Sequence, residues 1–269
     1  MPITRTVDIL GYPVSAGGLA ADAAAVLALI ETGGCGHFMA CANPHSLVVA
    51  DRDPLFRRAL LNADLLIPDG IGVVLASRLL KRPVQERVPG YEFFIALTDA
   101  AQRCGGIRYF FLGASQHTLE LIRTRLAREY PGITVSGLYS PPHHTSFTRE
   151  ENARMVAAVR AAAPHVLWVG LTAPKQEKWV FENRELLGVP FTGTIGAAFD
   201  FYAGTQRRSS PFWCRHGLEW LPRFLREPRR LWHRTIKSAP VFICRVIRQR
   251  LFTPRRGAAT PSVPPHRLL

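Results

Sequence analysis

Apolar and polar positions alternate along the first 200 residues in two different periods. Six short apolar runs, each bounded by Gly, Pro, Asn or charged residues, predict buried β-strands. Between them lie longer segments whose apolar residues recur every three to four positions, which predicts amphipathic helices. The predicted strands are residues 37–42, 65–67, 107–112, 133–139, 165–170 and 191–196, and the predicted helices are residues 20–31, 44–62, 73–80, 93–103, 116–130, 150–163 and 175–187.

This regular alternation requires parallel pairing, because each helix carries the chain back to the edge where the next strand begins. We therefore expect an α/β fold, a Rossmann-like parallel sheet with helices on both faces. Residues 6–14 predict a hairpin at the edge of that sheet. After Phe201 the chain becomes helical and rich in Arg, Trp, Phe and Pro, which indicates a C-terminal helical appendage. The expected domains are an α/β body at residues 1–205, the appendage at 206–252 and a disordered tail at 253–269.

The functional interpretation centres on the segment at residues 62–72, which reads NADLLIPDGIG. A predicted strand ends at Ile67, and Asp69 follows just past its carboxyl end, which is the edge where open α/β sheets bind ligands. Gly70 and Gly72 allow the backbone to approach a ligand closely. A carboxylate held in this place is a candidate general base. The alternative is that Asp69 only caps the helix that follows.

Three further loops are expected at the same edge of the sheet, at residues 41–43, 113–115 and 170–172. Each opens onto a helix N-terminus, whose partial positive charge attracts anions, so a group of such loops suits a diphosphate. Asn43 and Ser115 are equally well explained as helix caps. Lys175 and Gln176 lie in a first helical turn, where acidic residues are favoured, and we expect these two donors to face a nucleotide.

Other ligand motifs are missing from the chain. The Gly-Ile-Gly at residues 70–72 lacks the third glycine of a dinucleotide fingerprint, because Leu75 stands in its place, and no GxxxxGK[ST] phosphate loop occurs. Asp51 and Asp53 have the spacing of a metal-binding DxD pair, but we expect them on a solvated helix face. The five cysteines show no CxxC spacing, which disfavours a zinc site or a disulfide framework. We therefore expect no metal and no cofactor.

The net charge of +14 is concentrated at one end of the chain. Residues 206–256 carry 14 Lys and Arg against Glu219 and Glu227, and the remainder has a net charge of only +2. Basic residues interleaved with Trp and Phe suit an anionic membrane surface. They also suit nucleic acid, but a nucleic-acid-binding module or a membrane-bound scaffold leaves Asp69 without a role. Because no signal peptide or membrane span is evident, we expect a cytoplasmic protein attached peripherally to the membrane, with no nucleic-acid partner.

Six segments resemble, in order, the signature blocks of the WecG/TagA/CpsF glycosyltransferase family: ANPHSLVVADRD, ADLLIPDGIGVVLASRLL, RVPGYEFF, VGLTAPKQEKW, GTIGAAFDFYAGTQRR and GLEWLPRFLREPRRLWHR. The resemblance implies an inverting enzyme that moves a sugar from a UDP donor to a polyprenyl-diphosphate-linked sugar, in the synthesis of cell-surface polysaccharide. It also implies work at the inner face of the bacterial membrane. The donor sugar stays open among N-acetylmannosamine, its uronic acid, glucose and other sugars. The oligomeric state stays open as well, including a homo-oligomer.

The resemblance also implies residue roles. Asp69 matches the proposed catalytic base of the family, and the positions that match its donor pocket are Cys41, Asn43, Arg87, Gln176 and Asp200. Cys41 replaces a threonine, which removes a hydroxyl close to the donor. The arginines that match positions linked to the diphosphate or to the docking of the appendage are Arg208, Arg223 and Arg230. Ser210 stands where the family has a proline after the first of these arginines.

Overall fold

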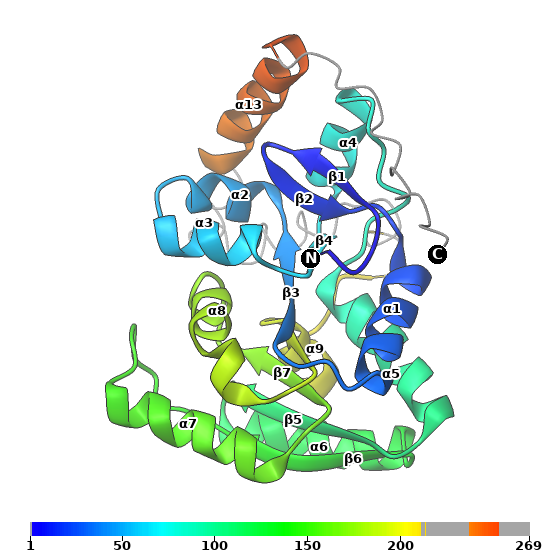
Figure 1. The fold of residues 1–269 in the computed structure, drawn as a ribbon, viewed down its shortest axis with the longest axis vertical. Helices are drawn as coiled ribbons and strands as arrows, with labels where there is room; N and C mark the ends of the chain where they lie inside the picture. Colours follow the sequence, from blue (N-terminus) through cyan, green and yellow to red (C-terminus); the bar gives the residue numbers. More distant parts are fainter. Residues whose placement is uncertain (1, 211–212, 214–236, 253–269) are drawn as a thin grey trace, which may run out of the picture.

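The computed structural model describes residues 2–210, 213 and 237–252 (Figure 1). Its main sheet has six strands, hydrogen-bonded in the order β4-β3-β8-β7-β5-β6, and every pairing is parallel. The predicted α/β fold with a parallel sheet is therefore confirmed. The strands are β3 (His37–Ala42), β4 (Leu65–Pro68), β5 (Ile107–Gly113), β6 (Ile133–Tyr139), β7 (Val166–Gly170) and β8 (Phe191–Thr194).

Side chains along the strands alternate between two apolar cores, one on each face of the sheet. On β3, for example, Phe38 and Ala40 enter the first core and Met39 enters the second. Because both faces are covered, the strands appear in the sequence as nearly continuous apolar runs. The first core is closed by α2 (Pro44–Ala50), α3 (Pro54–Leu61), α7 (Arg149–Ala162) and α8 (Lys175–Leu187), and the second by α1 (Leu19–Glu31), α5 (Gly90–Cys104), α6 (Gln116–Glu129) and α9 (Ala198–Ala203).

The Trp168 side chain of β7 lies at the centre of the second core. It is fully buried and makes edge-to-face contacts with Phe93, Phe94 and Tyr109 at ring-centroid distances of 5.1 to 6.5 Å. The indole also covers Gly193, its partner on β8, where an added Cβ would lie only 2.2 Å from the ring. The Trp168 ring on β7 therefore fits only because Gly193 on β8 has no side chain. This pairing holds β7 and β8 in register.

Two neighbouring strands, β3 and β8, send the chain to opposite faces of the sheet. From β3 the chain continues into α2 on the first core, and from β8 it continues into α9 on the second. Such a divergence opens a crevice beyond the carboxyl ends of the strands, which is the usual ligand position in doubly wound sheets. The predicted binding edge therefore coincides with a topological switch point.

The single helix predicted at residues 44–62 is wrong, because the chain forms two helices there. α2 ends at Ala50, and α3 begins at Pro54, whose missing N–H and fixed φ suit a first helical position. Asp53 caps α3 by accepting a hydrogen bond from the N–H of Phe56 at 3.0 Å. Asp51 and Asp53 therefore lie in the turn between two helices, and the prediction that placed them on one helix face is also wrong.

The predicted hairpin forms, but it is not an edge of the main sheet. β1 (Thr6–Ile9) and β2 (Tyr12–Ser15) pair with each other in a separate antiparallel sheet. Ile9, Tyr12 and Val14 are buried in the first core. The hairpin thus packs against β4 and completes the first core in the upper part of the molecule in Figure 1.

The last described helix, α13 (Ser238–Phe252), packs on α2 and α4. Phe242 and Val246 are buried in the first core. Gln249 accepts a hydrogen bond from the N–H of Leu10 at 2.9 Å, and Arg245 forms an ion pair with Asp51. Of the expected appendage, the structure describes residues 206–210, 213 and 237–252, and the expected tail at 253–269 lies outside the described residues.

The close approach of β5 and β7 predicts a large cost for a side chain at Gly113. This residue has φ +118°, and an added Cβ would lie 2.5 Å from the carbonyl oxygen of Gly170. We expect Gly113→Ala to lower the free energy of unfolding by about 3 kcal/mol, measured by urea denaturation. Gly105→Ala is the matched control, because Gly105 also has positive φ (+70°) but open space around it, and should cost only about 1 kcal/mol. Equal losses in the two variants would show that backbone conformation alone decides the cost.

Candidate active site

Asp69 lies where the sequence predicts it, one residue beyond the carboxyl end of β4. Its N–H donates to the carbonyl oxygen of Ala42 at 2.8 Å, which joins the end of β4 to the end of β3. On the other side, the N–H of Val88 donates to the carbonyl oxygen of Pro68 at 2.9 Å. The half-buried Asp69 is therefore held at a fixed position at the edge of the sheet, with the segment that contains Arg87 beside it.

The capping alternative for Asp69 is not what the structure shows. The N-cap position of α4 (Ile71–Leu79) belongs to Gly70, which has φ +128° and makes no side-chain cap. An added Cβ at Gly72 would lie 2.5 Å from the ring of Pro44, so this glycine permits the first turn of α4 to touch α2. Asp69 precedes the cap position, and its carboxylate belongs to the loop at the strand ends.

Asn43 and Ser115, by contrast, are helix caps. The side chain of Asn43 accepts from the N–H of Ser46, and the Ser46 hydroxyl accepts from the N–H of Asn43, both at 2.9 Å, which completes a capping box. Ser115 accepts from the N–H of Thr118 at 3.1 Å and caps α6. The Asn43 side chain still lies at the end of β3, beside the loop that follows β4, because a Cβ added at Gly70 would lie 3.8 Å from the Asn43 Cβ.

Cys41 occupies the centre of the candidate site. Its thiol donates to the carbonyl oxygen of Thr194 on β8, at a distance of 3.6 Å. An added Cβ at Gly90, the first residue of α5, would lie 3.4 Å from the Cys41 sulfur and 3.4 Å from the Ile195 side chain. The Pro-Gly start of α5 therefore lies against the ends of β3 and β8. Arg87 precedes this contact by three residues and is half-buried.

Gln176 lies on the far side of the same edge, in the first turn of α8 after β7. Its side chain is 4 % exposed, and its amide donates to a carboxylate oxygen of Glu177 at 2.9 Å. The amide oxygen has no hydrogen-bond partner among the described residues, and an added Cβ at Gly196 would lie 3.2 Å from it. A buried acceptor without a partner is costly, so a donor group from a ligand would stabilise it.

Lys175 does not face this site, contrary to the expectation from sequence. Its ammonium donates to the carbonyl oxygen of His144 and lies 3.6 Å from the centre of the Phe147 ring. Burial lowers the pKa of Lys175, and the nearby Glu151 opposes this shift. Lys175 therefore fixes the loop before α7, and only Gln176 of the predicted donor pair remains at the strand ends.

Asp200 and Arg208 follow β8 on the second face of the sheet. Asp200, in α9, accepts a hydrogen bond from the Thr205 hydroxyl at 3.2 Å. The Arg208 guanidinium forms an ion pair with Glu92 and lies 4.6 Å from the centre of the Tyr91 ring, both in the first turn of α5. Arg208 thus holds the start of the appendage next to Gly90. Arg223 and Arg230 lie outside the described residues.

The structure therefore brings Cys41, Asn43, Asp69, Arg87 and Gln176 to one edge, near the ends of β3, β4 and β7, which lie within the strand order β4-β3-β8-β7. The sequence analysis missed Tyr91 and Glu92 as partners of Arg208. The only sequence signal for this contact was the presence of an acidic residue, Glu92, close to the Pro-Gly start of α5. It also missed Glu177, the buried partner of Gln176, which looks like an ordinary acidic residue in a first helical turn.

The carboxylates of the DxD-like pair are used in structural contacts. Asp51 pairs with Arg245, and Asp53 pairs with Lys178 at 2.9 Å. Burial opposes ionisation of Asp53, but the N–H of Phe56 and the Lys178 ammonium outweigh it and lower the pKa of Asp53. Within residues 2–210, 213 and 237–252, no group of three or more His, Cys, Asp or Glu side chains is arranged to hold a metal ion.

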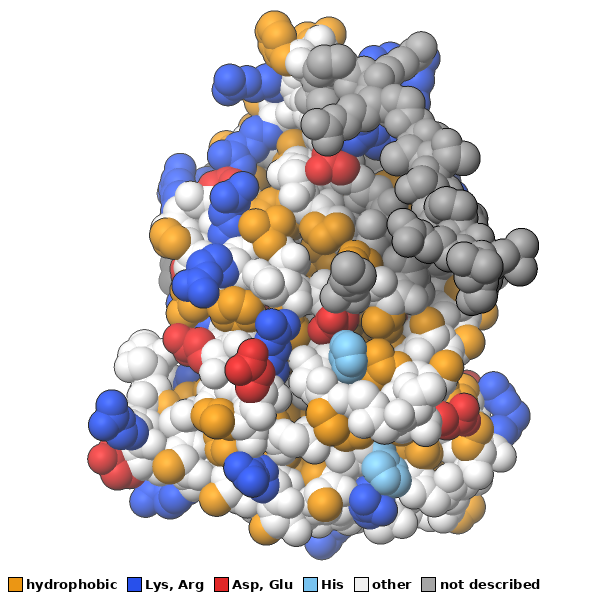
Figure 2. Space-filling model, in the orientation of Figure 1, with side chains coloured by type: hydrophobic (Ala, Val, Ile, Leu, Met, Phe, Trp, Pro, Cys, Tyr) orange, Lys and Arg blue, Asp and Glu red, His pale blue; other side chains and the backbone are white. Residues whose placement is uncertain are grey.

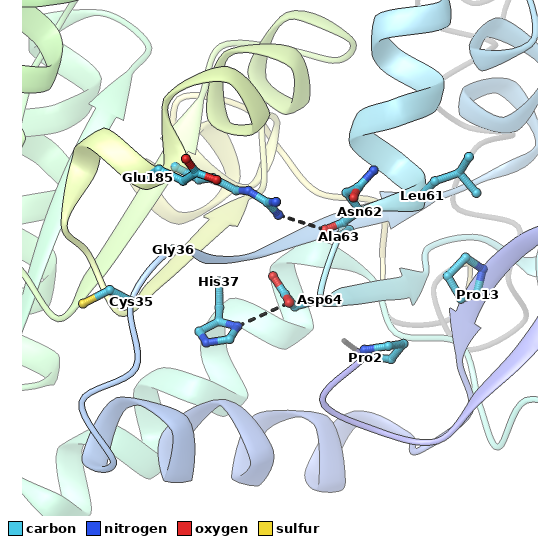
Figure 3. Close-up of a pocket in the computed structure, with 11 residues that line it drawn as sticks. Pro2, Pro13, Cys35, Gly36, His37, Leu61, Asn62, Ala63, Asp64 and Glu185 are labelled. Atoms are coloured by element: carbon cyan, nitrogen blue, oxygen red, sulfur yellow. Dashed lines mark hydrogen bonds and ion pairs between the residues drawn. The ribbon is translucent and has the colours of Figure 1, made fainter.

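A hollow of about 670 Å³ lies at the opposite, amino edge of the sheet (Figure 3). His37 and Asp64 face each other there, with Nδ1 and Oδ1 3.3 Å apart, and Arg184 donates to the carbonyl oxygen of Asn62. Asp64 also accepts from the N–H of Phe38 at 3.1 Å. These polar groups fix the starts of β3 and β4. The hollow is at the wrong edge for a ligand site of a doubly wound sheet.

The capping box predicts a stability effect at Asn43. Asn43→Ala should lower the free energy of unfolding by about 1 kcal/mol, because the N–H of Ser46 loses its partner. Asn43→Asp should leave stability nearly unchanged, since aspartate is an equally good cap. Urea denaturation of both variants tests this, with Ser115→Ala as a second cap of the same kind. If Asn43→Ala is as stable as the parent, the box contributes nothing to folding.

Comparison with known proteins identifies relatives of this chain. The sequence model of the Glycosyl transferase WecG/TagA/CpsF family matches residues 7–256. An N-acetylglucosaminyldiphosphoundecaprenol N-acetyl-beta-D-mannosaminyltransferase from Bacillus spizizenii is 32% identical over 226 residues, which cover 84% of this chain and 82% of the relative. Enzymes of the same name are 28% identical in Bacillus subtilis, over 80% of each chain, and 27% identical in Staphylococcus aureus, over 78% of this chain and 79% of the relative.

The family match spans both the strand-end segments around Asp69 and the basic C-terminal region. The sequence resemblance and the observed fold agree with it. The chain therefore belongs to the WecG/TagA/CpsF family and is a glycosyltransferase.

Proposed function

We propose that this enzyme transfers N-acetylmannosamine from a UDP donor to polyprenyl-diphosphate-linked N-acetylglucosamine, with inversion at the anomeric carbon. The relatives from Bacillus and Staphylococcus are named for transfer of this sugar to this kind of acceptor. The observation that carries the proposal is the convergence of Asp69, Arg87 and Gln176 at one edge of the sheet. The nucleic-acid alternative gives these three residues no role.

The donor pocket is proposed at the crevice between β3 and β8. Gln176 offers a buried amide oxygen that lacks a partner among the described residues, which suits an N–H or O–H group of the donor. Cys41 lines the centre of the crevice with a thiol, a weak donor that is larger than the hydroxyl expected from the family pattern. Asn43 and Asp200 complete the proposed donor set. The amide hydrogens of Asn43 stay available for a ligand because its oxygen serves as the cap.

The proposed chemistry is a single displacement. Asp69 takes the proton from the attacking hydroxyl of the acceptor sugar as that oxygen bonds to the anomeric carbon. The bond from this carbon to the UDP oxygen breaks at the same time, and the diphosphate leaves with the bonding electrons. Arg87 and the N-terminus of α4, which begins two residues after Asp69, stabilise the negative charge that develops on the diphosphate.

The basic appendage is proposed to bind the inner face of the cell membrane, where a polyprenyl acceptor is anchored. Among the residues that the structure describes, no helix combines the length and the apolar character needed to cross a bilayer. Attachment would therefore come from basic and aromatic residues of segment 206–252, with Arg223 and Arg230 reaching the diphosphate. Arg208 ties the start of this segment to the first turn of α5, close to Gly90. A homo-oligomer is compatible with this arrangement.

Asp69→Asn should lower turnover by about 10²- to 10⁴-fold while leaving the fold intact, because the amide cannot accept the proton. Transfer from UDP-N-acetylmannosamine to a short-chain prenyl-diphosphate N-acetylglucosamine, followed by mass spectrometry, gives the rate. Asp99→Asn is the control: Asp99 is exposed on α5 and accepts a hydrogen bond from the Tyr130 hydroxyl, which an amide oxygen can also do. Near-normal turnover of the Asp69 variant would contradict its role as base, and no transfer by the parent protein would contradict the proposed substrates.

Turnover should be unaffected by excess EDTA. The only closely spaced aspartate pair is engaged with Arg245 and Lys178, so it is not arranged to hold a cation against the diphosphate. The measurement compares initial rates with and without the chelator, and again after adding Mg²⁺ or Mn²⁺. Loss of activity in EDTA that Mg²⁺ restores would mean that a set of metal ligands exists elsewhere in the chain.

A further inference from the structure

Exposed apolar side chains gather on two helices that touch each other. Among the described residues, eight large hydrophobic side chains are exposed, and seven of them belong to α4 or α13. The two helices are in contact. The eighth is Leu186, which belongs to α8. The seven residues are Leu75 and Leu79 on α4, and Val241, Ile243, Ile247, Leu251 and Phe252 on α13. We call this set the α4–α13 face.

The outward side of α13 consists mainly of apolar residues, like the buried side of an ordinary helix. Ser238, Phe242 and Val246 point inward and are buried, while Pro240 and Cys244 join the exposed apolar residues. Of the three arginines between residues 238 and 252, Arg248 is exposed and Arg245 and Arg250 are half-buried. A solvated surface helix normally carries polar residues on its outer side. An apolar outer side therefore indicates that something covers it.

The exposure is not the result of a loosely attached helix. The inner side of α13 is fastened by Phe242 and Val246 in the first core, and by the ion pair of Arg245 with Asp51. Ser238 bonds the ring of His45 at 2.8 Å, and Gln249 bonds the hairpin. Contacts at both ends and in the middle fix which side faces outward. The α4–α13 face is thus a feature of the folded body.

The charged side chains carried by the two helices of this face and the residues next to them are all basic, and the acids beside them, Asp8 and Asp51, are paired with Arg82 and Arg245. Residues 71–82 and 237–252 contain no Asp or Glu. Exposed basic side chains there include Arg78, Lys81, Lys237 and Arg248. In Figure 2, Lys and Arg side chains flank the upper end of the molecule, and hydrophobic side chains cover its tip. A second copy of the same face would bring like charges together. The segment at 214–236 carries six Arg and two Glu, so its net positive charge would also repel the basic residues of this face.

The face lies at the same end of the molecule as the carboxyl edge of the sheet. In Figure 1, β3 points toward the end where α4 and α13 lie, away from α6 and α7. α4 begins two residues after Asp69. One short helix therefore connects the candidate base with the exposed leucines.

We propose that the α4–α13 face is a membrane-docking surface that inserts into the interface of an anionic bilayer. Leu75 and Leu79 of the catalytic body enter the interface together with Ile243, Ile247 and the tip of α13, while the basic residues contact lipid phosphates. The body itself thus contacts lipid, and the basic appendage is not the sole attachment. The inference rests on the proposed function in one respect, because it takes the acceptor to be lipid-linked.

Co-sedimentation of the full chain with vesicles tests the proposal. The parent protein should bind vesicles containing phosphatidylglycerol, bind pure phosphatidylcholine weakly, and lose binding as salt is raised. Leu75→Gln with Leu79→Gln should lower the partition constant by about tenfold, because apolar area no longer leaves water. Ile243→Gln with Ile247→Gln should have a similar effect. Glutamine is a good helix former, so folding should survive, as checked by circular dichroism.

Leu186→Gln is the matched control, since Leu186 and Leu75 are each 54% exposed and both are on helices. It should bind vesicles like the parent. Transfer to a water-soluble short-chain acceptor should be unchanged in the Leu75/Leu79 variant. Transfer to a long-chain acceptor in vesicles should fall along with binding. The soluble assay reports on the proposed function, so its failure in the parent is distinguishable from failure of vesicle binding.

Three results would overturn the proposal. If the Leu75/Leu79 variant binds vesicles as well as the Leu186 variant does, α4 is not part of the surface. If the parent protein ignores anionic vesicles, the face is covered by something other than lipid. If sedimentation velocity shows a dimer that the Ile243/Ile247 substitutions dissociate, and vesicle binding is absent, the occupant is a second copy of the chain.

Discussion

The hydrogen bond from the N–H of Asp69 to the carbonyl oxygen of Ala42 joins the ends of β3 and β4 and is the contact on which the site depends. Because all six strands are parallel, every strand delivers its following loop to the same edge, and this bond fixes the height at which two of the loops begin. The N–H of Val88 donates to the carbonyl oxygen of Pro68, and this second bond holds the start of α5 at the same height. Without these backbone contacts, Asp69 and Arg87 would belong to separate loops with no defined relation. The covalent order of the chain does not bring them together, but the sheet does.

Small residues then decide how closely the helices can approach this edge. Gly90 lets the first turn of α5 lie against Cys41, and Gly72 lets the first turn of α4 lie against Pro44. Helix N-termini placed this close to a strand edge direct their partial positive charge at one small volume. That arrangement is suited to a diphosphate leaving group, because electrostatic stabilisation needs donors that are in place before charge develops. In the proposed displacement, the same packing would make a general acid unnecessary, because a diphosphate that is already stabilised leaves without a proton.

The sequence alone was sufficient for the strands, the parallel sheet and the position of Asp69, because these follow from local periodicity and from the turn residues at 68–72. It was insufficient wherever one residue type serves two purposes. A proline within an apolar pattern can kink one helix or begin a new one, and Pro54 begins α3. Lys175 has the same local sequence signal as Gln176, but Phe147, 28 positions earlier, draws its ammonium away from the edge. The pairing of Arg208 with Glu92 joins residues 116 positions apart, and no local pattern contains that information.

The proposed docking surface changes how the acceptor would reach the site. α4 has nine residues and is therefore about 14 Å long, so Asp69 would lie within one helix length of the interface in which Leu75 and Leu79 are embedded. The headgroup region on each side of a bilayer is only about 5 to 8 Å thick, so a diphosphate attached to a membrane-embedded prenyl chain sits close to that interface. A rigid helix that starts at the catalytic loop and ends in lipid would hold the base at a constant height above the membrane. Such a link restricts the encounter of enzyme and acceptor to two dimensions and a narrow range of orientations, which favours reaction with a lipid-linked sugar over a free one.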